Sequence, residues 1–259
     1  MEDFFYAGGL RALMVELGDK LDLNVKTVTG QTLKECIKGS KNYNSDVIRT
    51  LKNPVYHEGS LAVLKGNLAP DGAVIKPAAM DPKFQKHNGP AIVADSYAEL
   101  KEIINDEDYP ITADHILVLR NAGPKGGPGM PEWGMIPMPK ALLKQGHRDM
   151  IRLSDARMSG TSYGACILHV APEAFIGGPL ALIRTGDIIH VDIPNRKLDV
   201  DISKSEMKKR QEDWVAPKPR YERGYGYIYS KHIEQADKGC DFDFLSTDFG
   251  AAVEEPEIN

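Results

Sequence analysis

Residues 115–132 read His-Ile-Leu-Val-Leu-Arg-Asn-Ala-Gly-Pro-Lys-Gly-Gly-Pro-Gly-Met-Pro-Glu, a strand-like run followed by an unusual loop. The last ten of these residues hold four glycines and three prolines, a density that excludes a regular helix or strand. We therefore expect a rigidly shaped loop at a strand end, which either presents backbone N–H groups to an anion or is a tight connection without a ligand. The Gly-Lys-Ser/Thr ending of a phosphate-binding P-loop is missing, which argues against a nucleotide.

Short apolar runs that alternate with Gly, Pro, Asn and Asp continue on both sides of this stretch. Residues 115–119 are one such run, and the others are 61–64, 73–75, 91–93, 150–153, 165–170, 188–193 and 197–202. Many short strands at close spacing favour a sheet that curls into a barrel or folds as a sandwich. Two Ser-x-x-Glu capping motifs, at residues 96–99 and 203–206, predict helix starts, and the second helix should end near Trp214.

The first 57 residues have a different pattern of apolar residues, one that favours helices. Apolar residues at positions 10, 13, 14 and 17 follow the spacing of one helix face, and Gly18 suits the end of that helix. Residues 32–38 and 45–51 predict two shorter helices. After Lys-Asn-Pro at residues 52–54 the helical spacing of apolar residues gives way to short strand-like runs, so we expect a domain boundary between residues 53 and 60.

Charge is distributed unevenly along the 259 residues. The chain has 32 basic and 37 acidic side chains, a net charge of −5, but residues 241–259 hold six of the acids and no Lys or Arg. The remainder, with 32 basic and 31 acidic side chains, is nearly neutral, so neither nucleic acid nor an anionic membrane is expected as a partner. We interpret the acidic tail as a solvated end.

The N-terminal sequence and the cysteines bear on location and on metal binding. The start is acidic and no apolar run is long enough for a signal or a membrane span, so we expect a cytoplasmic location. Cys36, Cys166 and Cys240 are widely separated, without the spacing of a metal site. We expect each of them to be a small buried hydrophobe.

Two stretches carry residues suited to chemistry. Glu132 ends the glycine-proline loop, and a carboxylate beside open backbone is a suitable hard ligand for Mg²⁺. Residues 154–164 read Ser-Asp-Ala-Arg-Met-Ser-Gly-Thr-Ser-Tyr-Gly. In one interpretation Ser159 accepts a proton while Arg157 holds an acid substrate through its carboxylate, because a nearby cation can favour a serine alkoxide. In a simpler one, Asp155 and Arg157 pair with each other.

A different chemistry is formally possible in the second stretch. Residues 160–164 match the Gly-x-Ser-x-Gly pattern, which would make Ser162 an acyl-transfer nucleophile with a later Asp and one of His169, His190 or His232 as partners. That pattern requires a strand directly before it and a helix directly after it. Here a polar segment precedes and a β-rich run follows, so we place a hydrolase last.

At these two stretches the chain resembles the dihydroxy-acid and sugar-acid dehydratase family. The family's signatures are Gly-Pro-Lys-Gly-Gly-Pro-Gly-Met-Pro-Glu, here residues 123–132, and Asp-x-Arg-x-Ser-Gly, here residues 155–160. The resemblance continues through residues 66–72, 169–174, 177–179 and 184–187. Ser-Asp-Ala-Arg-Met-Ser-Gly-Thr at 154–161 and the ending at 238–245 look more like the pentonate (arabonate and xylonate) and related sugar-acid branch.

The resemblance implies elimination of water from a 2,3-dihydroxy acid, giving a 2-keto-3-deoxy acid, with Mg²⁺ and an iron-sulfur cluster of the 2Fe-2S or 4Fe-4S type as cofactors. Carried over by position, Glu132 matches a Mg²⁺ ligand, and Ser159 matches the serine that removes the C2 proton. Thr161 is expected to contact substrate or to orient Ser159, and Arg157 to bind the substrate. The implied fold is α+β, mainly a swivelling β/α barrel with a short helical N-terminal segment.

Family members are about twice as long as this chain, and their N-terminal half supplies the cluster cysteines, further Mg²⁺ carboxylates and a modified lysine. We therefore expect residues 1–57 to be the helical tail of a missing N-terminal α/β domain, and residues 58–259 to be the C-terminal β-barrel domain. The cluster would be bound by residues absent from this chain. The expected partners are a small sugar-acid substrate, the missing domain and, in the full-length enzyme, further copies in a homo-oligomer. The alternative is a catalytically silent stand-alone domain.

Overall fold

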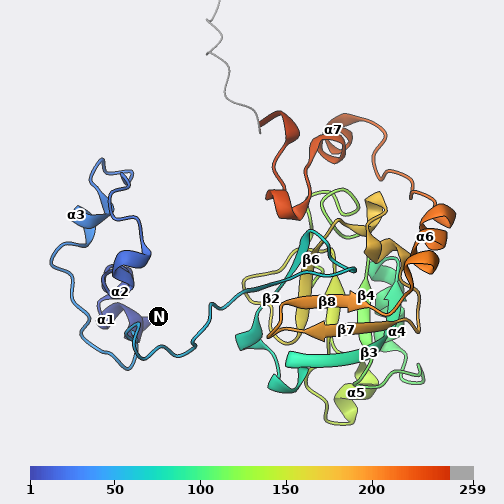
Figure 1. Ribbon diagram of the computed structural model, residues 1–259, viewed down its shortest axis with the longest axis horizontal. Helices are drawn as coiled ribbons and strands as arrows, with labels where there is room; N and C mark the ends of the chain where they lie inside the picture. The colour runs from blue at the N-terminus through green and yellow to red at the C-terminus, as the bar shows by residue number, and fades with distance from the viewer. Residues whose placement is uncertain (246–259) are drawn as a thin grey trace, which may run out of the picture. The chain divides into compact units, whose positions relative to one another are not determined.

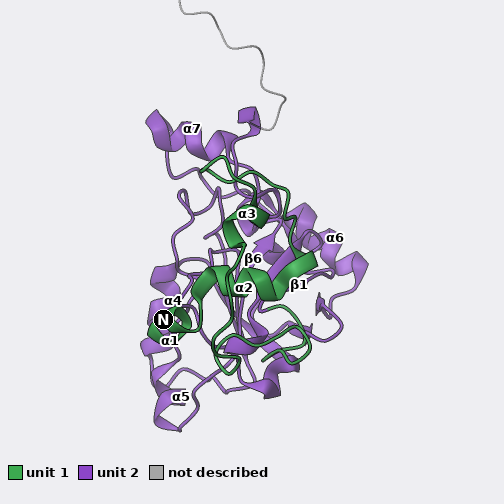
Figure 2. Cartoon of the chain, turned by 90° about the vertical axis from the view of Figure 1, so that its left-hand side faces the viewer, with its two compact units in different colours: residues 1–59 green, residues 60–259 purple. Residues whose placement is uncertain are grey.

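The computed structural model describes residues 1–245. The chain divides into two compact units, residues 1–59 and 60–259, which Figure 2 colours separately. Four acids of the predicted solvated tail, Asp248, Glu254, Glu255 and Glu257, lie outside the described residues. Within the described residues, no helix combines the length and the apolar character that crossing a membrane requires.

The first unit contains three α-helices, α1 (Glu2–Tyr6), α2 (Gly9–Leu17) and α3 (Leu33–Ile37). As predicted, α2 ends at Gly18, whose positive φ of 49° suits a glycine. The α3 helix begins with a complete capping box, in which Thr32 and Glu35 each accept a backbone N–H of the other. The apolar face predicted for α2 is only partly covered, since Leu10 remains 58% exposed.

The helix predicted at residues 45–51 is wrong, because these residues form turns. Two asparagines explain the difference. The Asn44 side chain accepts the N–H of Asp46, and the Asn42 side chain donates to the Ile48 carbonyl. Such side-chain bonds offer the backbone an alternative to the helical hydrogen-bond ladder.

The second unit is built on an eight-stranded sheet in the order β1-β2-β6-β5-β4-β3-β7-β8. The strands are β1 (Ala62–Leu64), β2 (Gly72–Ile75), β3 (Lys86–Ala94), β4 (Ile116–Leu119), β5 (Arg152–Ser154), β6 (Cys166–Ala171), β7 (Ile188–Asp192) and β8 (Lys197–Val200). A bridge between Lys65 and Lys197 joins the two ends of this order, so the sheet is a nearly closed barrel rather than a sandwich. All eight predicted runs form strands, and the predicted α+β class with a mainly β-barrel core is confirmed.

Strand direction changes around the barrel, and this change positions the site. The four strands β3, β4, β5 and β6 are parallel neighbours, whereas β3, β7 and β8 pair antiparallel on the other side (Figure 1). All four residues of β4 are buried, as is typical of a parallel strand covered on both faces. Because the strands are parallel, the loops that follow β4, β5 and β6 leave the barrel at the same end.

The helices of the second unit are α4 (Tyr97–Asn105), α5 (Lys140–Lys144), α6 (Lys204–Asp213) and α7 (Gly224–His232). Ser96 and Ser203 cap α4 and α6 as predicted, each accepting the N–H of the glutamate three residues later. In neither of the two predicted capping boxes does the glutamate side chain accept the N–H of the cap serine. The Glu99 side chain accepts from Asp95 N, one residue before the cap, and Glu206 pairs with Arg210.

A buried ion pair anchors the start of β6 inside the barrel. Arg152 on β5 bonds Asp149 at 2.9 Å, and their side chains are only 2% and 9% exposed. The Asp149 carboxylate also accepts the N–H groups of Ala165 and Asp81. Gly164 lies against this pair with a φ of +79°, and a Cβ there would collide with Arg152 Nη2 and Asp149 Oδ1.

We predict that Gly164→Ala destabilises the barrel unit by about 3–5 kcal/mol, because it disrupts a buried ion pair. The matched control is Gly146→Ala, which has a similar φ of +89° but nothing within 4 Å of an added Cβ, so about 1–2 kcal/mol is expected from backbone strain alone. Urea unfolding followed by tryptophan fluorescence measures both, since Trp133 and Trp214 lie in this unit. Equal losses would show that the ion pair is not disturbed.

Candidate functional site

The loop at residues 121–132 is held by a buried carboxylate from the next strand end. Asp155, directly after β5, accepts the N–H groups of Asn121 at 3.2 Å, Ala122 at 2.9 Å and Ala174 at 2.9 Å. Its side chain is completely buried. Burial and the neighbouring Glu173 carboxylate raise the pKa of Asp155 to about 7, against the opposing effect of the three N–H bonds.

A second buried carboxylate, Glu173 after β6, binds the middle of the same loop. It accepts the N–H groups of Lys125 at 2.8 Å and Gly126 at 2.9 Å, and the Gln235 side chain donates to it at 2.7 Å. Burial raises the pKa of Glu173. The N–H groups of Lys125 and Gly126 are therefore bound by a side chain of the same protein, which for these two groups agrees with the second interpretation of the sequence, a tight connection without a ligand.

Close packing explains why glycines are needed in this loop. A Cβ at Gly123 would lie 2.7 Å from Glu173 Oε2, and one at Gly126 would lie 2.8 Å from the Asn121 carbonyl. Both distances are shorter than side chains tolerate, so only glycine lets the loop approach the carboxylate that holds it.

Two of the predicted site residues meet at the end of the loop. Arg157 Nη2 lies 3.1 Å from Glu132 Oε1, and both side chains are 49% exposed. The simpler interpretation, in which Asp155 pairs with Arg157, is wrong, since the Asp155 carboxylate binds backbone N–H groups of the buried loop. The guanidinium of the expected substrate-binding residue thus partly neutralises the expected Mg²⁺ ligand.

Ser159 and Thr161 also lie together, in the turn that connects β5 to β6. The Ser159 and Thr161 hydroxyl oxygens are 3.1 Å apart, and the Thr161 N–H donates to Ser159 Oγ at 3.3 Å. The turn is closed by the Ser162 N–H, which donates to the Ser159 carbonyl at 3.1 Å. A negative charge on Ser159 Oγ would therefore accept two hydrogen bonds from Thr161.

Ser162, the serine of the hydrolase hypothesis, has a structural position. Its side chain is 5% exposed, and its Oγ accepts the Ser159 N–H at 3.1 Å. The strand β6 follows the turn, where a nucleophile elbow requires a helix. The local geometry thus excludes the elbow, and Ser162 instead helps to shape the turn that carries Ser159.

Lys76 contributes to this turn, although no motif in the sequence singled it out. It follows β2, and its ammonium donates to the main-chain carbonyls of Ser159 at 2.9 Å, Gly160 at 3.0 Å and Ser162 at 3.4 Å. A second tether, from the Gly164 N–H to the Ala79 carbonyl, holds the same two segments together. A lysine directly after an apolar run gives no sequence signal for such a role.

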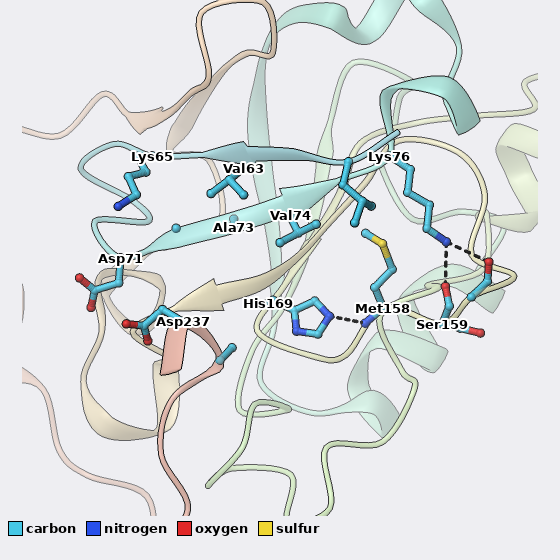
Figure 3. Close-up of a pocket in the computed structure, with 14 residues that line it drawn as sticks. Val63, Lys65, Asp71, Ala73, Val74, Lys76, Met158, Ser159, His169 and Asp237 are labelled. Carbon is cyan, nitrogen blue, oxygen red and sulfur yellow. Dashed lines mark hydrogen bonds between the residues drawn. The ribbon is translucent and has the colours of Figure 1, made fainter. Parts of the chain in front are cut away.

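A cavity of about 600 Å³ lies between β1, β2, β6 and this turn (Figure 3). Ser159 and Lys76 line one end of it, with apolar side chains such as Val63, Val74 and Met158 along its walls. The titratable and charged side chains that line it are Lys65, Asp71, Lys76, His169 and Asp237. Ser159 is thus accessible from a cavity large enough for a small molecule.

His169 enters the cavity because β6 is irregular there. The pairing between β2 and β6 shifts register between Gly72 and Val74, and His169 has a positive φ of 56°. Such bulges redirect a side chain relative to the regular sheet. His169 Nε2 accepts the Met158 N–H at 2.9 Å, which requires an unprotonated nitrogen, and burial, with a smaller contribution from the Arg157 charge, lowers the ring's pKa.

The metal-binding capacity of the described residues is limited. Residues 1–245 contain no group of three or more His, Cys, Asp or Glu side chains that could hold a metal ion. All three cysteines are free thiols, and only Cys166 is buried, so the expectation of burial is wrong for Cys36 and Cys240. Burial raises the pKa of the Cys166 and Cys240 thiols. Within residues 1–245 the side chains do not fit an iron-sulfur cluster, and the role of Glu132 as a Mg²⁺ ligand stays a prediction.

Residues 46–240 match the family described as dihydroxy-acid/6-phosphogluconate dehydratase C-terminal, and the chain belongs to this family. A 6-deoxy-6-sulfo-D-gluconate dehydratase of Pseudomonas putida is 49% identical, covering 100% of this chain and 45% of the relative. An L-arabonate dehydratase of Azospirillum brasilense is 45% identical, with coverages of 98% and 45%. A dihydroxy-acid dehydratase of Acetivibrio thermocellus is also 45% identical, with coverages of 93% and 43%.

The chain thus spans less than half the length of each of these relatives. The resemblance that the two motifs indicated is confirmed, and the relatives are named as dehydratases of sugar acids and of dihydroxy acids.

We predict that the pKa of the His169 ring lies below 6.5 and rises towards that value in Arg157→Gln. The neutral ring is the hydrogen-bond acceptor, so its contact with Met158 N persists above the folded-state pKa and is lost as the pH falls through it. NMR titration of the ring protons measures this, with His169→Gln for assignment and exposed Arg148→Gln as control. A shift of equal size in both arginine variants would contradict a specific effect of Arg157.

Asp155 should make the folding stability of the barrel unit fall as the pH rises, whereas the His169 hydrogen bond is lost as the pH falls. The pKa of Asp155 rises from 3.8 to about 7 on folding, so its contribution to stability falls as the pH rises between those values. Asp155→Asn cannot ionise. Urea unfolding of both proteins across this range should show the stability advantage of the wild type shrinking with pH, and an advantage independent of pH would refute the raised pKa.

Proposed function

We propose that this chain is the C-terminal part of a hydro-lyase that converts a 2,3-dihydroxy sugar acid to a 2-keto-3-deoxy acid. The observation that carries the proposal is the Ser159 turn at the cavity: a serine hydroxyl bonded by Thr161, with the Lys76 ammonium on the adjacent carbonyls. A serine acts as a base only where its alkoxide is stabilised, and this turn supplies donors and a positive charge for that purpose.

In the proposed reaction Ser159 Oγ takes the proton from C2 of the substrate. The C2–H electron pair forms the C2–C3 double bond while the bond from C3 to its hydroxyl breaks, and the departing hydroxide becomes water by taking a proton. The resulting enol tautomerises to the 2-keto acid. Thr161 holds Ser159 Oγ in place through its N–H and hydroxyl groups.

Glu132 is proposed as one ligand of a Mg²⁺ ion, together with carboxylates of the N-terminal domain. When bound, Mg²⁺ would polarise the substrate oxygens next to C2 and make the C2 proton more acidic. Since Glu132 now pairs with Arg157, a cation at Glu132 would release that guanidinium to bind the substrate carboxylate in bidentate fashion.

Several parts of the proposal concern the longer protein. Residues 1–57 would be the end of its N-terminal domain, which would supply the iron-sulfur cluster ligands. The cytoplasmic location and the homo-oligomer stay predictions. The alternative, a catalytically silent stand-alone domain, is motivated by the absence of iron-sulfur cluster ligands among residues 1–245, and a clean stop upstream together with a start signal of its own would support it.

The test uses the longer polypeptide that contains this chain, purified anaerobically with Mg²⁺ and supplied with pentonates. Ser159→Ala should lower kcat by roughly 10²- to 10⁴-fold, the usual contribution of a positioned base, and leave the thermal unfolding midpoint nearly unchanged. The matched control is Ser205→Ala on exposed α6, which should keep normal turnover. Unchanged turnover in Ser159→Ala would sink the assignment of the base.

A further inference from the structure

Lys76 occupies an unusual position for a charged residue at the edge of a cavity. Its ammonium donates to three main-chain carbonyls of one turn, those of Ser159, Gly160 and Ser162. Figure 3 shows the contacts to Ser159 and Gly160. An ammonium group has no further donors. Lys76 therefore cannot hold a substrate carboxylate in this arrangement, and its charge acts on the turn itself.

One of the three hydrogen bonds from Lys76 is made to the peptide group that also contacts the proposed base, Ser159. The Gly160 carbonyl, which accepts from Lys76, belongs to the same peptide group as the Thr161 N–H, which donates to Ser159 Oγ. A hydrogen bond to the oxygen of a peptide group strengthens its N–H as a donor, because the two dipoles polarise each other. The positive charge on Lys76 is thus connected to Ser159 Oγ through a single peptide unit.

We infer that Lys76 is a positioning residue that stabilises the alkoxide of Ser159, by polarising the Gly160–Thr161 peptide and by fixing the turn. The inference rests on the proposed function, because it assigns a role to Lys76 through the base named there. Lys76 itself touches neither the reacting atoms nor the substrate.

The other charged groups around Ser159 do not share this connection. Arg157, two residues away, pairs with Glu132, and His169 binds Met158 N as a neutral ring. The remaining charged side chains of the cavity are Lys65, Asp71 and Asp237. Among the described residues, Lys76 alone donates to the peptide whose N–H reaches Ser159 Oγ.

The first experiment uses the 259-residue chain and needs no catalysis. We expect the Thr161 amide proton resonance to move upfield in Lys76→Met, because its hydrogen bond to Ser159 Oγ weakens. Lys76→Arg, which keeps the charge, should retain most of the wild-type shift. Lys101→Met, at an exposed position of α4, is the matched loss of charge and should leave this resonance in place. An unmoved Thr161 resonance in Lys76→Met overturns the polarisation.

The second experiment uses the longer, cofactor-loaded polypeptide. Loss of a charge-assisted hydrogen bond in Lys76→Met should lower kcat by roughly 10- to 100-fold, with KM changed by less than about 2-fold. The rise of kcat with pH should move to higher pH, so that part of the loss is recovered there, and Lys76→Arg should restore most of the activity. A loss of the same size at every pH would indicate a purely structural role and overturn the inference.

The two proposals fail in different ways. If Ser159→Ala abolishes turnover but Lys76→Met keeps the wild-type rate and pH profile, the role of Lys76 is wrong and the proposed function stands. If Ser159→Ala keeps normal turnover, the assignment of Ser159 as the base fails, and the role of Lys76 fails with it, whereas a cofactor-loaded wild type without dehydratase activity would overturn the proposed function itself. Amide resonances of the β7 and β8 strands report whether Lys76→Met folds, and Lys76→Arg serves as the second variant where it does not.

Discussion

Two buried carboxylates, Asp155 and Glu173, hold together the loops that leave the barrel after β4, β5 and β6. Between them they accept N–H groups from Asn121 and Ala122, directly before the glycine-proline loop, and from Lys125 and Gly126 within it, and Asp155 also accepts from the segment after β6. Burying a carboxylate is costly unless donors surround it. Here the donors are main-chain groups of an irregular loop, which would otherwise be unsatisfied themselves. The buried carboxylates and the main-chain N–H groups of the loop therefore satisfy each other's hydrogen-bonding requirement.

The hydrogen bonds of Asp155 and Glu173 also influence where the candidate site residues lie. The loop needs glycine at Gly123 to approach Glu173 and at Gly126 to pack against the Asn121 backbone, and it ends at Glu132, which lies beside Arg157. The same connection from β5 to β6 continues through the Ser159 turn. The Arg152–Asp149 pair fixes the far end of that turn at Gly164. Between the two buried anchors, the turn has little freedom except to face the cavity.

The sequence was most informative where the pattern is local. Eight apolar runs, the Gly18 helix end and the Ser96 and Ser203 caps all depend on residues a few positions apart, and all are present. It was misleading at residues 45–51, where two asparagines compete with the helix. The pairings of Glu132 with Arg157 and of Lys76 with the Ser159 turn join residues 25 and more than 80 positions apart, so no local pattern announces them.

By itself, then, the sequence determined the family, the strand content and the two stretches that carry the candidate chemistry, because long motifs and short-range hydrophobic patterns are properties of neighbouring residues. The hydrophobic pattern left barrel and sandwich open, the family resemblance implied a barrel, and only the tertiary structure shows how it closes, through the bridge of Lys65 to Lys197. It also decided which carboxylates are buried anchors and which one is half exposed at the site. These outcomes depend on strand order and on contacts between distant segments, which form only when the sheet closes.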